Sequence, residues 1–261
     1  MKLYKIIGAC LLSGLCVTGA FSREVISFND GWLFKKGPFA TDVMKATAQW
    51  ESKWTDVTIP HTWNAKDMQV KTNSFYEGAA YYRKTYVIPE TMKGKRLFLR
   101  FEGVGTCTEV YVNGYLVGTH KGGYSAFVCE IGEQVKYGGS NEIVVKADNT
   151  ARLDVIPVNH SLFGVYGGIY RPVSLVVTEP CHIAVEDYAS PGVYITQKNV
   201  SKSAAEVNVK VKLDNASLQP EMLELENEIY DAEGKLVKKH VRSLELTPQG
   251  MQSYTASFQL K

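Results

Sequence analysis

The side chains in this sequence that could do acid–base chemistry are scattered carboxylates, and no catalytic motif joins them. The sequence has no Gly-x-Ser-x-Gly elbow, no phosphate-binding loop and no His-Glu-x-x-His pair. Spacing alone pairs no two of the carboxylates Glu77, Glu102, Glu109 and Asp148. We therefore predict no catalytic residue in this chain.

Aromatic, amide and carboxylate side chains gather in two segments, which contain Trp63, Asn64, Tyr76 and Glu77. A pyranose sugar offers a C–H face to aromatic rings and a rim of hydroxyls to hydrogen-bonding groups. These four residues are therefore our candidate substrate-binding residues. The alternative is that the rings fill the core and the ends of a β-sandwich, and composition alone favours this second interpretation.

The sequence predicts no metal, no cofactor and no nucleic-acid partner. No Cys-x-x-Cys pair is present, and no metal-ligand spacing relates the five histidines at positions 61, 120, 160, 182 and 240. The sequence has 29 Lys and Arg residues and 27 Asp and Glu residues. Removal of a leader that contains Lys2 and Lys5 leaves 27 of each, so the mature chain has no net charge. A neutral chain lacks the basic surface that binds nucleic-acid phosphates.

The first 22 residues have the order of a secretory signal peptide. A basic start with Lys2 and Lys5 precedes an apolar run over 6–17, and small residues follow over 18–22. The apolar run is shorter than the roughly 20 residues that a membrane-spanning helix needs. We expect an exported protein, periplasmic or extracellular, and the sequence leaves open whether it is soluble or tethered to a membrane.

Strands are predicted over much of the remaining chain because apolar residues alternate with polar ones. This alternation covers 96–101, 110–112, 115–117, 142–147, 173–178, 207–213, 223–229 and 254–260. Asn113-Gly114 joins two of these segments and is a strong signal for a tight hairpin. We predict an all-β protein with a jelly-roll β-sandwich over 23–180 and an incomplete immunoglobulin-like β-sandwich over 181–261.

Seven short motifs follow one another from Phe28 to Arg171. They are Phe28-Asn29-Asp30-Gly31-Trp32, 54–63, 76–84, 99–104, 110–114, 117–127 and Gly167-Gly168-Ile169-Tyr170-Arg171. Their types and order resemble the N-terminal sugar-binding jelly roll of the family 2 glycoside hydrolases, with a lean toward the β-galactosidases. The resemblance covers 26–178, and the strands that follow resemble the immunoglobulin-like domain of the same family.

The resemblance implies a non-catalytic role for this chain. In this family two glutamates of a retaining mechanism lie on a (β/α)8 barrel, which needs at least ~200 residues. Only 81 residues follow position 180. We therefore expect the N-terminal region of an exported glycosidase that hydrolyses terminal β-glycosides, with the catalytic barrel of the same full-length protein as its partner.

In that setting the chain would support the barrel, and the Glu77 loop would reach the carbohydrate substrate. Docking on a barrel also predicts an exposed apolar patch. A homo-oligomer is left open. Two alternatives are a free-standing carbohydrate-binding module and a pure assembly domain, and sugar binding by the isolated chain would exclude the second.

Overall fold

The computed structural model of the chain describes residues 23–37, 54–67, 69, 75–158, 160 and 164–260. The expected signal peptide, 1–22, lies outside the described residues. Regular structure is almost entirely β-strand, so the all-β prediction is confirmed. Within these ranges no helix is long and apolar enough to cross a membrane.

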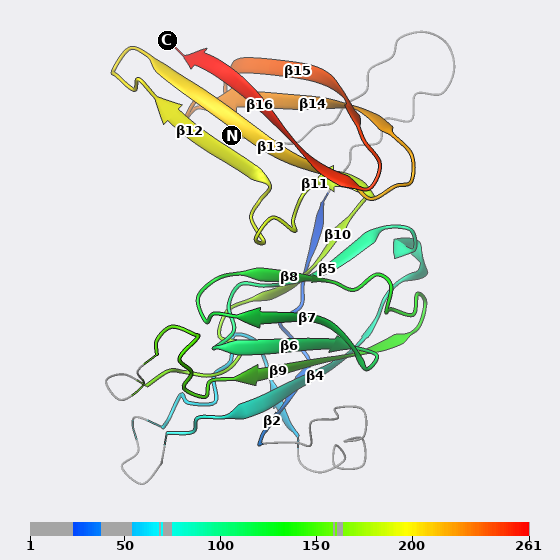
Figure 1. Cartoon of the computed structure of the whole chain (residues 1–261), viewed down its shortest axis with the longest axis vertical. Coiled ribbons are helices and arrows are strands. Elements are labelled where there is room, and N and C mark those ends of the chain that lie inside the picture. The colour runs from blue at the N-terminus through cyan, green and yellow to red at the C-terminus, as the bar shows by residue number, and fades with distance from the viewer. Residues whose placement is uncertain are drawn as a thin grey trace. The chain divides into compact units, whose positions relative to one another are not determined.

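The chain divides into two compact units (Figure 1). We call the first, Val25–Val177, the N-terminal sandwich. The second, which we call the C-terminal sandwich, runs from Thr178 onward and includes Arg23 and Glu24. Each unit has its own hydrophobic core.

The N-terminal sandwich contains a six-stranded sheet in the order β3-β2-β4-β9-β6-β7 and a four-stranded sheet in the order β1-β10-β5-β8. The six-stranded sheet consists of β2 (Trp32–Lys36), β3 (Thr55–Val57), β4 (Ala79–Val87), β6 (Cys107–Val112), β7 (Tyr115–Lys121) and β9 (Ser140–Asp148). The four-stranded sheet consists of β1 (Glu24–Ser27), β5 (Arg96–Phe101), β8 (Phe127–Glu130) and β10 (Val173–Thr178). A 3-10 turn, η2 (Glu90–Met92), precedes β5.

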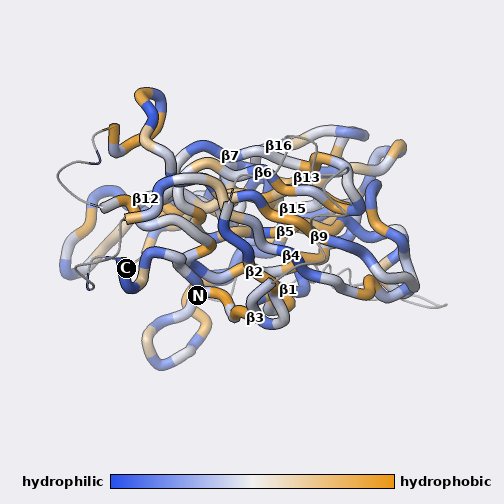
Figure 2. The backbone as a smooth tube through the Cα atoms, turned by 90° about the horizontal axis from the view of Figure 1, so that it is seen from below, coloured by the Kyte–Doolittle hydropathy of each residue, from blue (hydrophilic) through white to orange (hydrophobic). Residues whose placement is uncertain are grey.

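The core of this sandwich is rich in aromatic residues. Hydrophobic and hydrophilic stretches are interspersed along the chain (Figure 2), and buried positions alternate with more exposed ones along β6, which turns one face inward. Phe28, Trp32 and Tyr82 are almost fully buried and pack with aliphatic residues of both sheets. Burying a large apolar side chain contributes about 1.5–3 kcal/mol, so these rings are a main source of the unit's stability.

The predicted hairpin is confirmed. Asn113 and Gly114 connect β6 to β7 with φ values of 49° and 84°. Positive φ at both central residues is typical of a type I′ turn, which Asn-Gly adopts readily. The Asn113 amide also donates hydrogen bonds to the Gln134 carbonyl (2.7 Å) and to Oδ1 of Asn141 (2.8 Å).

The C-terminal sandwich is centred on one long strand. Its strands are β11 (Cys181–Ile183), β12 (Val193–Lys198), β13 (Ala205–Asn215), β14 (Glu221–Tyr230), β15 (Leu236–Leu246) and β16 (Gly250–Leu260). β13 pairs with β11, β12 and β16, and β14 pairs with β15. The core is mostly aliphatic, with Val211, Leu213 and Leu246 fully buried.

Candidate substrate-binding loops

The four candidate residues lie in loops of the N-terminal sandwich that are hydrogen-bonded to one another. We call the segments 61–67, 75–78 and 164–168 the end loops. The structure brings Trp63, Asn64 and Tyr76 into direct contact, and Glu77 follows Tyr76 in the chain. The end loops therefore form one connected cluster.

Asn64 is completely buried and joins all three end loops. Its Nδ2 donates to Oδ2 of Asp67 (2.8 Å) and to the carbonyl oxygen of Tyr76 (2.9 Å). Its Oδ1 accepts from the backbone N–H of Gly167 (2.8 Å) and from Nδ2 of Asn149 (3.3 Å). The amide is thus used within the protein to hold the loops together.

Asn149, which sequence reasoning missed, completes this connection from the end of β9. Its Nδ2 donates to the Val165 carbonyl (2.7 Å), and its Oδ1 accepts from the backbone N–H of Gly78 (2.9 Å). The only signal in the sequence is an asparagine two residues after a predicted strand, and asparagine is common in turns. Its long-range partners could not be read from that signal.

Trp63 is buried among the same loops. Its ring stacks on Phe34 with 6.0 Å between centroids and meets Tyr76 edge to face at 6.3 Å. Its Nε1 donates to the Tyr76 carbonyl at 3.4 Å. A Cβ at Gly167 would lie 1.9 Å from the indole, so only glycine at position 167 lets the ring occupy this place.

Tyr76 is half-buried and uses its hydroxyl within its own loop. The hydroxyl donates to the Ala79 carbonyl at 2.8 Å. Burial raises the pKa of Tyr76, with a further contribution from the charge of Asp148. Nζ of Lys36 lies 5.4 Å from the centroid of the ring, within cation–π range. The phenol is therefore a neutral hydrogen-bond donor that closes the turn into β4.

Asp67 supplies the charge inside the cluster. Burial acts to raise the pKa of Asp67, but hydrogen bonds from the Tyr76 backbone N–H (3.1 Å) and the Asn64 amide outweigh it and lower the pKa. The carboxylate consequently stays ionised, and this is the form that accepts both bonds.

Glu77 differs from the other three candidates because its carboxylate reaches the surface. Its Oε1 lies 3.0 Å from Nδ1 of His160, and the Glu77 side chain is 33% exposed against 7% for His160. The histidine therefore orients the carboxylate while leaving part of it open to solvent. Glu77 is the candidate with polar atoms available to a ligand.

The other carboxylates considered from the sequence have separate partners. Glu102 pairs with Arg100 (2.8 Å) and Glu109 pairs with Lys146 (2.7 Å). Oδ1 of Asp148 accepts from the backbone N–H of Thr150 at 2.8 Å. These contacts fasten the sheet surface and the strand ends.

Comparison with known proteins identifies the family. Residues 16–180 match the family "Glycosyl hydrolases family 2, sugar binding domain". The chain belongs to glycosyl hydrolase family 2. The resemblance described from the sequence motifs is thereby confirmed.

Family 2 relatives with curated names are similar over most of this chain. A β-glucuronidase of Bacteroides fragilis is 42% identical over 193 residues, which are 74% of this chain and 26% of the relative. A β-galactosidase of Thermoanaerobacter pseudethanolicus is 34% identical over 189 residues, 72% of this chain and 24% of the relative. The chain therefore spans about a quarter of the length of these curated relatives.

Solved family 2 structures share the fold. The crystal structure of a putative β-galactosidase from Bacteroides fragilis is 67% identical, with a TM-score of 0.87 over 92% of this chain and 36% of that one. A β-glucuronidase from Bacteroides uniformis has a TM-score of 0.83 at 28% identity, over 92% of this chain and 28% of that one. The chain corresponds to the N-terminal region of these family 2 proteins.

Proposed function

We propose that this chain is the exported, non-catalytic N-terminal part of a family 2 glycosidase that hydrolyses terminal β-galactosides. In this proposal it supports the catalytic barrel and contributes Glu77 to the substrate pocket. The observation that carries the proposal is the 67% identity, over 92% of the chain, to a structure described as a putative β-galactosidase.

Exposed apolar side chains support a docking role. Leu153 is 93% exposed, and Tyr124 and Ile156 are also largely exposed. An ion pair between Lys121 and Asp154 (2.6 Å) joins the two segments that carry them. A domain that docks on a partner leaves apolar side chains exposed when the partner is absent, so we propose that these side chains contact the barrel.

The position of Glu77 supports a role in the pocket. A carboxylate forms charge-assisted hydrogen bonds with sugar hydroxyls, and these are stronger than bonds between neutral groups. Trp63, Asn64 and Tyr76 would then act indirectly, by holding the 75–78 loop in place through the contacts described above.

Hydrolysis assays test the proposal as a whole. Chromogenic β-galactoside, β-glucuronide and β-mannoside are offered to this chain and to the longer protein that contains it. We expect hydrolysis of the β-galactoside by the longer protein alone. Hydrolysis by the 261-residue chain would contradict the non-catalytic assignment, and a preference for another sugar would contradict the substrate.

The substitution Glu77→Gln in the longer protein tests the pocket role. We expect kcat/KM for the β-galactoside to fall about 10- to 100-fold, the effect of losing one hydrogen bond to a charged group. The free energy of unfolding should change by less than about 0.5 kcal/mol, because the His160 contact is near the surface. Glu90→Gln, at an exposed carboxylate on η2, is the matched control. Equal kcat/KM values in the two variants would show that Glu77 has no role in the pocket.

Export is tested on the protein made in a bacterial host. We expect N-terminal sequencing of the exported protein to begin at Phe21 or Arg23, after removal of the leader. An intact Met1 on the exported protein would contradict cleavage, and confinement to the cytoplasm would contradict export.

A further inference from the structure

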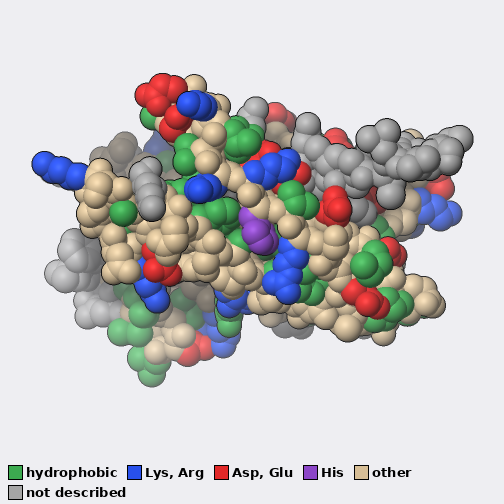
Figure 3. Space-filling view, turned by 90° about the horizontal axis from the view of Figure 1, so that it is seen from above, with side chains coloured by type: hydrophobic (Ala, Val, Ile, Leu, Met, Phe, Trp, Pro, Cys, Tyr) green, Lys and Arg blue, Asp and Glu red, His purple; other side chains and the backbone are tan. Residues whose placement is uncertain are grey.

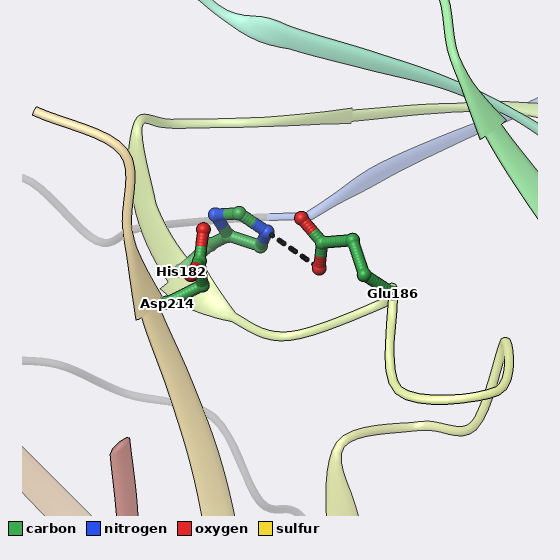
Figure 4. Close-up of side chains that lie close together, drawn as sticks. All are labelled: His182, Glu186 and Asp214. Carbon is green, nitrogen blue, oxygen red and sulfur yellow. Dashed lines mark ion pairs between the residues drawn. The ribbon is translucent and has the colours of Figure 1, made fainter. Parts of the chain in front are cut away.

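Three potential metal ligands come together in the C-terminal sandwich. His182 lies on β11, Asp214 is its pairing partner on β13, and Glu186 lies in the loop after β11 (Figure 4). One ring nitrogen of His182 and one oxygen of each carboxylate all lie within 4.8 Å of one another. We propose that these three side chains bind a divalent transition-metal ion, with Zn²⁺ as the best fit.

The donor spacing suits a shared metal ion. Nε2 of His182 lies 3.4 Å from Oε2 of Glu186, farther apart than the ~2.7–2.9 Å of a charged hydrogen bond. Two ligands that each lie ~2.0–2.1 Å from a tetrahedral zinc ion are separated by ~3.4 Å. The His182–Glu186 distance therefore matches one edge of a zinc tetrahedron, and an Asp214 oxygen, within 4.8 Å of both other donors, would supply a third corner.

The surrounding backbone orients the ligands. His182 is 5% exposed, and its Nδ1 faces the Pro180 carbonyl oxygen at 3.4 Å. Metal-bound histidines commonly donate their second ring N–H to such an acceptor. Oε2 of Glu186 accepts from the Val185 backbone N–H at 2.8 Å. Two of the three donors are thus held in place before any ion arrives.

The donor types and charges select the metal. Two carboxylates and a neutral imidazole balance a divalent cation, and an imidazole nitrogen favours zinc-like ions over Ca²⁺ and Mg²⁺, which prefer oxygen ligands. The neighbouring Asp187 is paired with Lys212 at 2.7 Å. The guanidinium of Arg23 donates to the Ile183 backbone carbonyl at 2.9 Å, one residue along the chain from His182.

A metal ion here would have a structural role. It would connect β11, the loop after it and β13, and so fasten the first strand of the C-terminal sandwich to its central strand. An ion that binds the folded state alone stabilises that state in proportion to the logarithm of its concentration. This site is independent of the proposed glycosidase function.

Calorimetric titration of the metal-free 261-residue chain with ZnCl2 tests the site, with CaCl2 titrated separately. We expect one Zn²⁺ per chain, a higher thermal midpoint with Zn²⁺, and no response to Ca²⁺. Asp214→Asn and Glu186→Gln keep the side-chain shapes and should each weaken Zn²⁺ binding more than about 10-fold, the least effect seen when outer-shell partners are lost. Absence of Zn²⁺ binding would overturn the proposal.

Two control variants separate this site from surface binding. His240 is an exposed histidine on β15. Figure 3 shows Lys, Arg, Asp and Glu side chains dispersed over the face seen from above, so the controls are chosen at exposed positions. His240→Gln and Glu233→Gln should leave Zn²⁺ affinity unchanged. Loss of binding in either control, or equal affinity in Asp214→Asn and the wild type, would overturn the proposal.

Zinc X-ray absorption of the loaded chain gives a readout that does not depend on variants. We expect nitrogen and oxygen ligands near ~2.0–2.1 Å. Cys181 is buried next to His182 in the chain, so a sulfur ligand near ~2.3 Å would assign the ion to a cysteine site and overturn the proposed ligand set.

Discussion

The two sandwiches hold their loops by different chemistry. In the N-terminal sandwich, buried neutral amides of Asn64 and Asn149 bridge the end loops around the Trp63 ring. In the C-terminal sandwich, the loop after β11 is held by ionisable side chains, among them Asp187, whose carboxylate contacts Lys212. Neutral amides keep their hydrogen bonds as pH changes, whereas carboxylates lose theirs on protonation. The amide bridges of the N-terminal loops are therefore a fixed support, to which the ionised Asp67 adds a pH-dependent contact, whereas the loop after β11 depends on the charge of Asp187.

The largest expected effect is at the centre of the fixed support. Trp63→Ala removes a buried ring that stacks on Phe34, and we expect the free energy of unfolding to fall by about 3–5 kcal/mol. Urea unfolding of the chain measures it. Tyr115→Ala, at a ring that is 65% exposed, is the control and should cost less than about 1 kcal/mol. Similar losses in both variants would show that Trp63 does not brace the loops.

A smaller loss is expected when one buried amide is removed. Asn64→Ala leaves the backbone N–H of Gly167 and the Tyr76 carbonyl without this partner, and we expect a loss of about 2–3 kcal/mol. Asn208→Ala, at a partly exposed amide on β13, is the matched control and should be near neutral. In the same urea experiment, a near-neutral Asn64→Ala would show that the amide does not hold the end loops.

The smallest effect, and a pH-dependent one, is expected in the C-terminal sandwich. Hydrogen bonds from Lys212 and Tyr194 lower the pKa of Asp187 below that of an unfolded chain. The stabilisation they provide is therefore full above the ordinary Asp pKa of about 3.9 and is lost as pH falls through the lower, folded-state pKa. Asp187→Asn should accordingly be less stable than the wild type at pH 6.

Urea unfolding at pH 6 and at successively lower pH measures that difference. We expect the gap between Asp187→Asn and the wild type to close as the wild-type carboxylate becomes protonated. A gap that stays constant with pH would show that the Asp187 charge does not stabilise the loop. The contrast between pH-independent amide bridges in the N-terminal sandwich and a charge-dependent loop in the C-terminal sandwich would then fail on its C-terminal side.

Much of the fold could be predicted because strand periodicity is local. The predicted segments 96–101 and 173–178 coincide with β5 and β10, and 207–213 lies within β13. β15 was missed because nearly all of its side chains are exposed, so charged residues interrupt the alternation. Sequence reasoning also found Trp63, Asn64, Tyr76 and Glu77, but it missed Asp67 and Asn149, whose hydrogen-bond partners could not be read from the local sequence.

The sequence by itself determined the all-β class, the Asn113-Gly114 turn and the family, because these depend on neighbouring residues and on motif order. Tertiary structure alone decided what the side chains do. Asn64 meets Gly167 across 103 residues, so its amide serves the loops and leaves Glu77 as the candidate at the surface. His182 and Glu186 meet Asp214 because β11 pairs with β13 in one register. Local patterns contain no information on which distant segments will come into contact. Those long-range contacts position the functional side chains proposed for this chain.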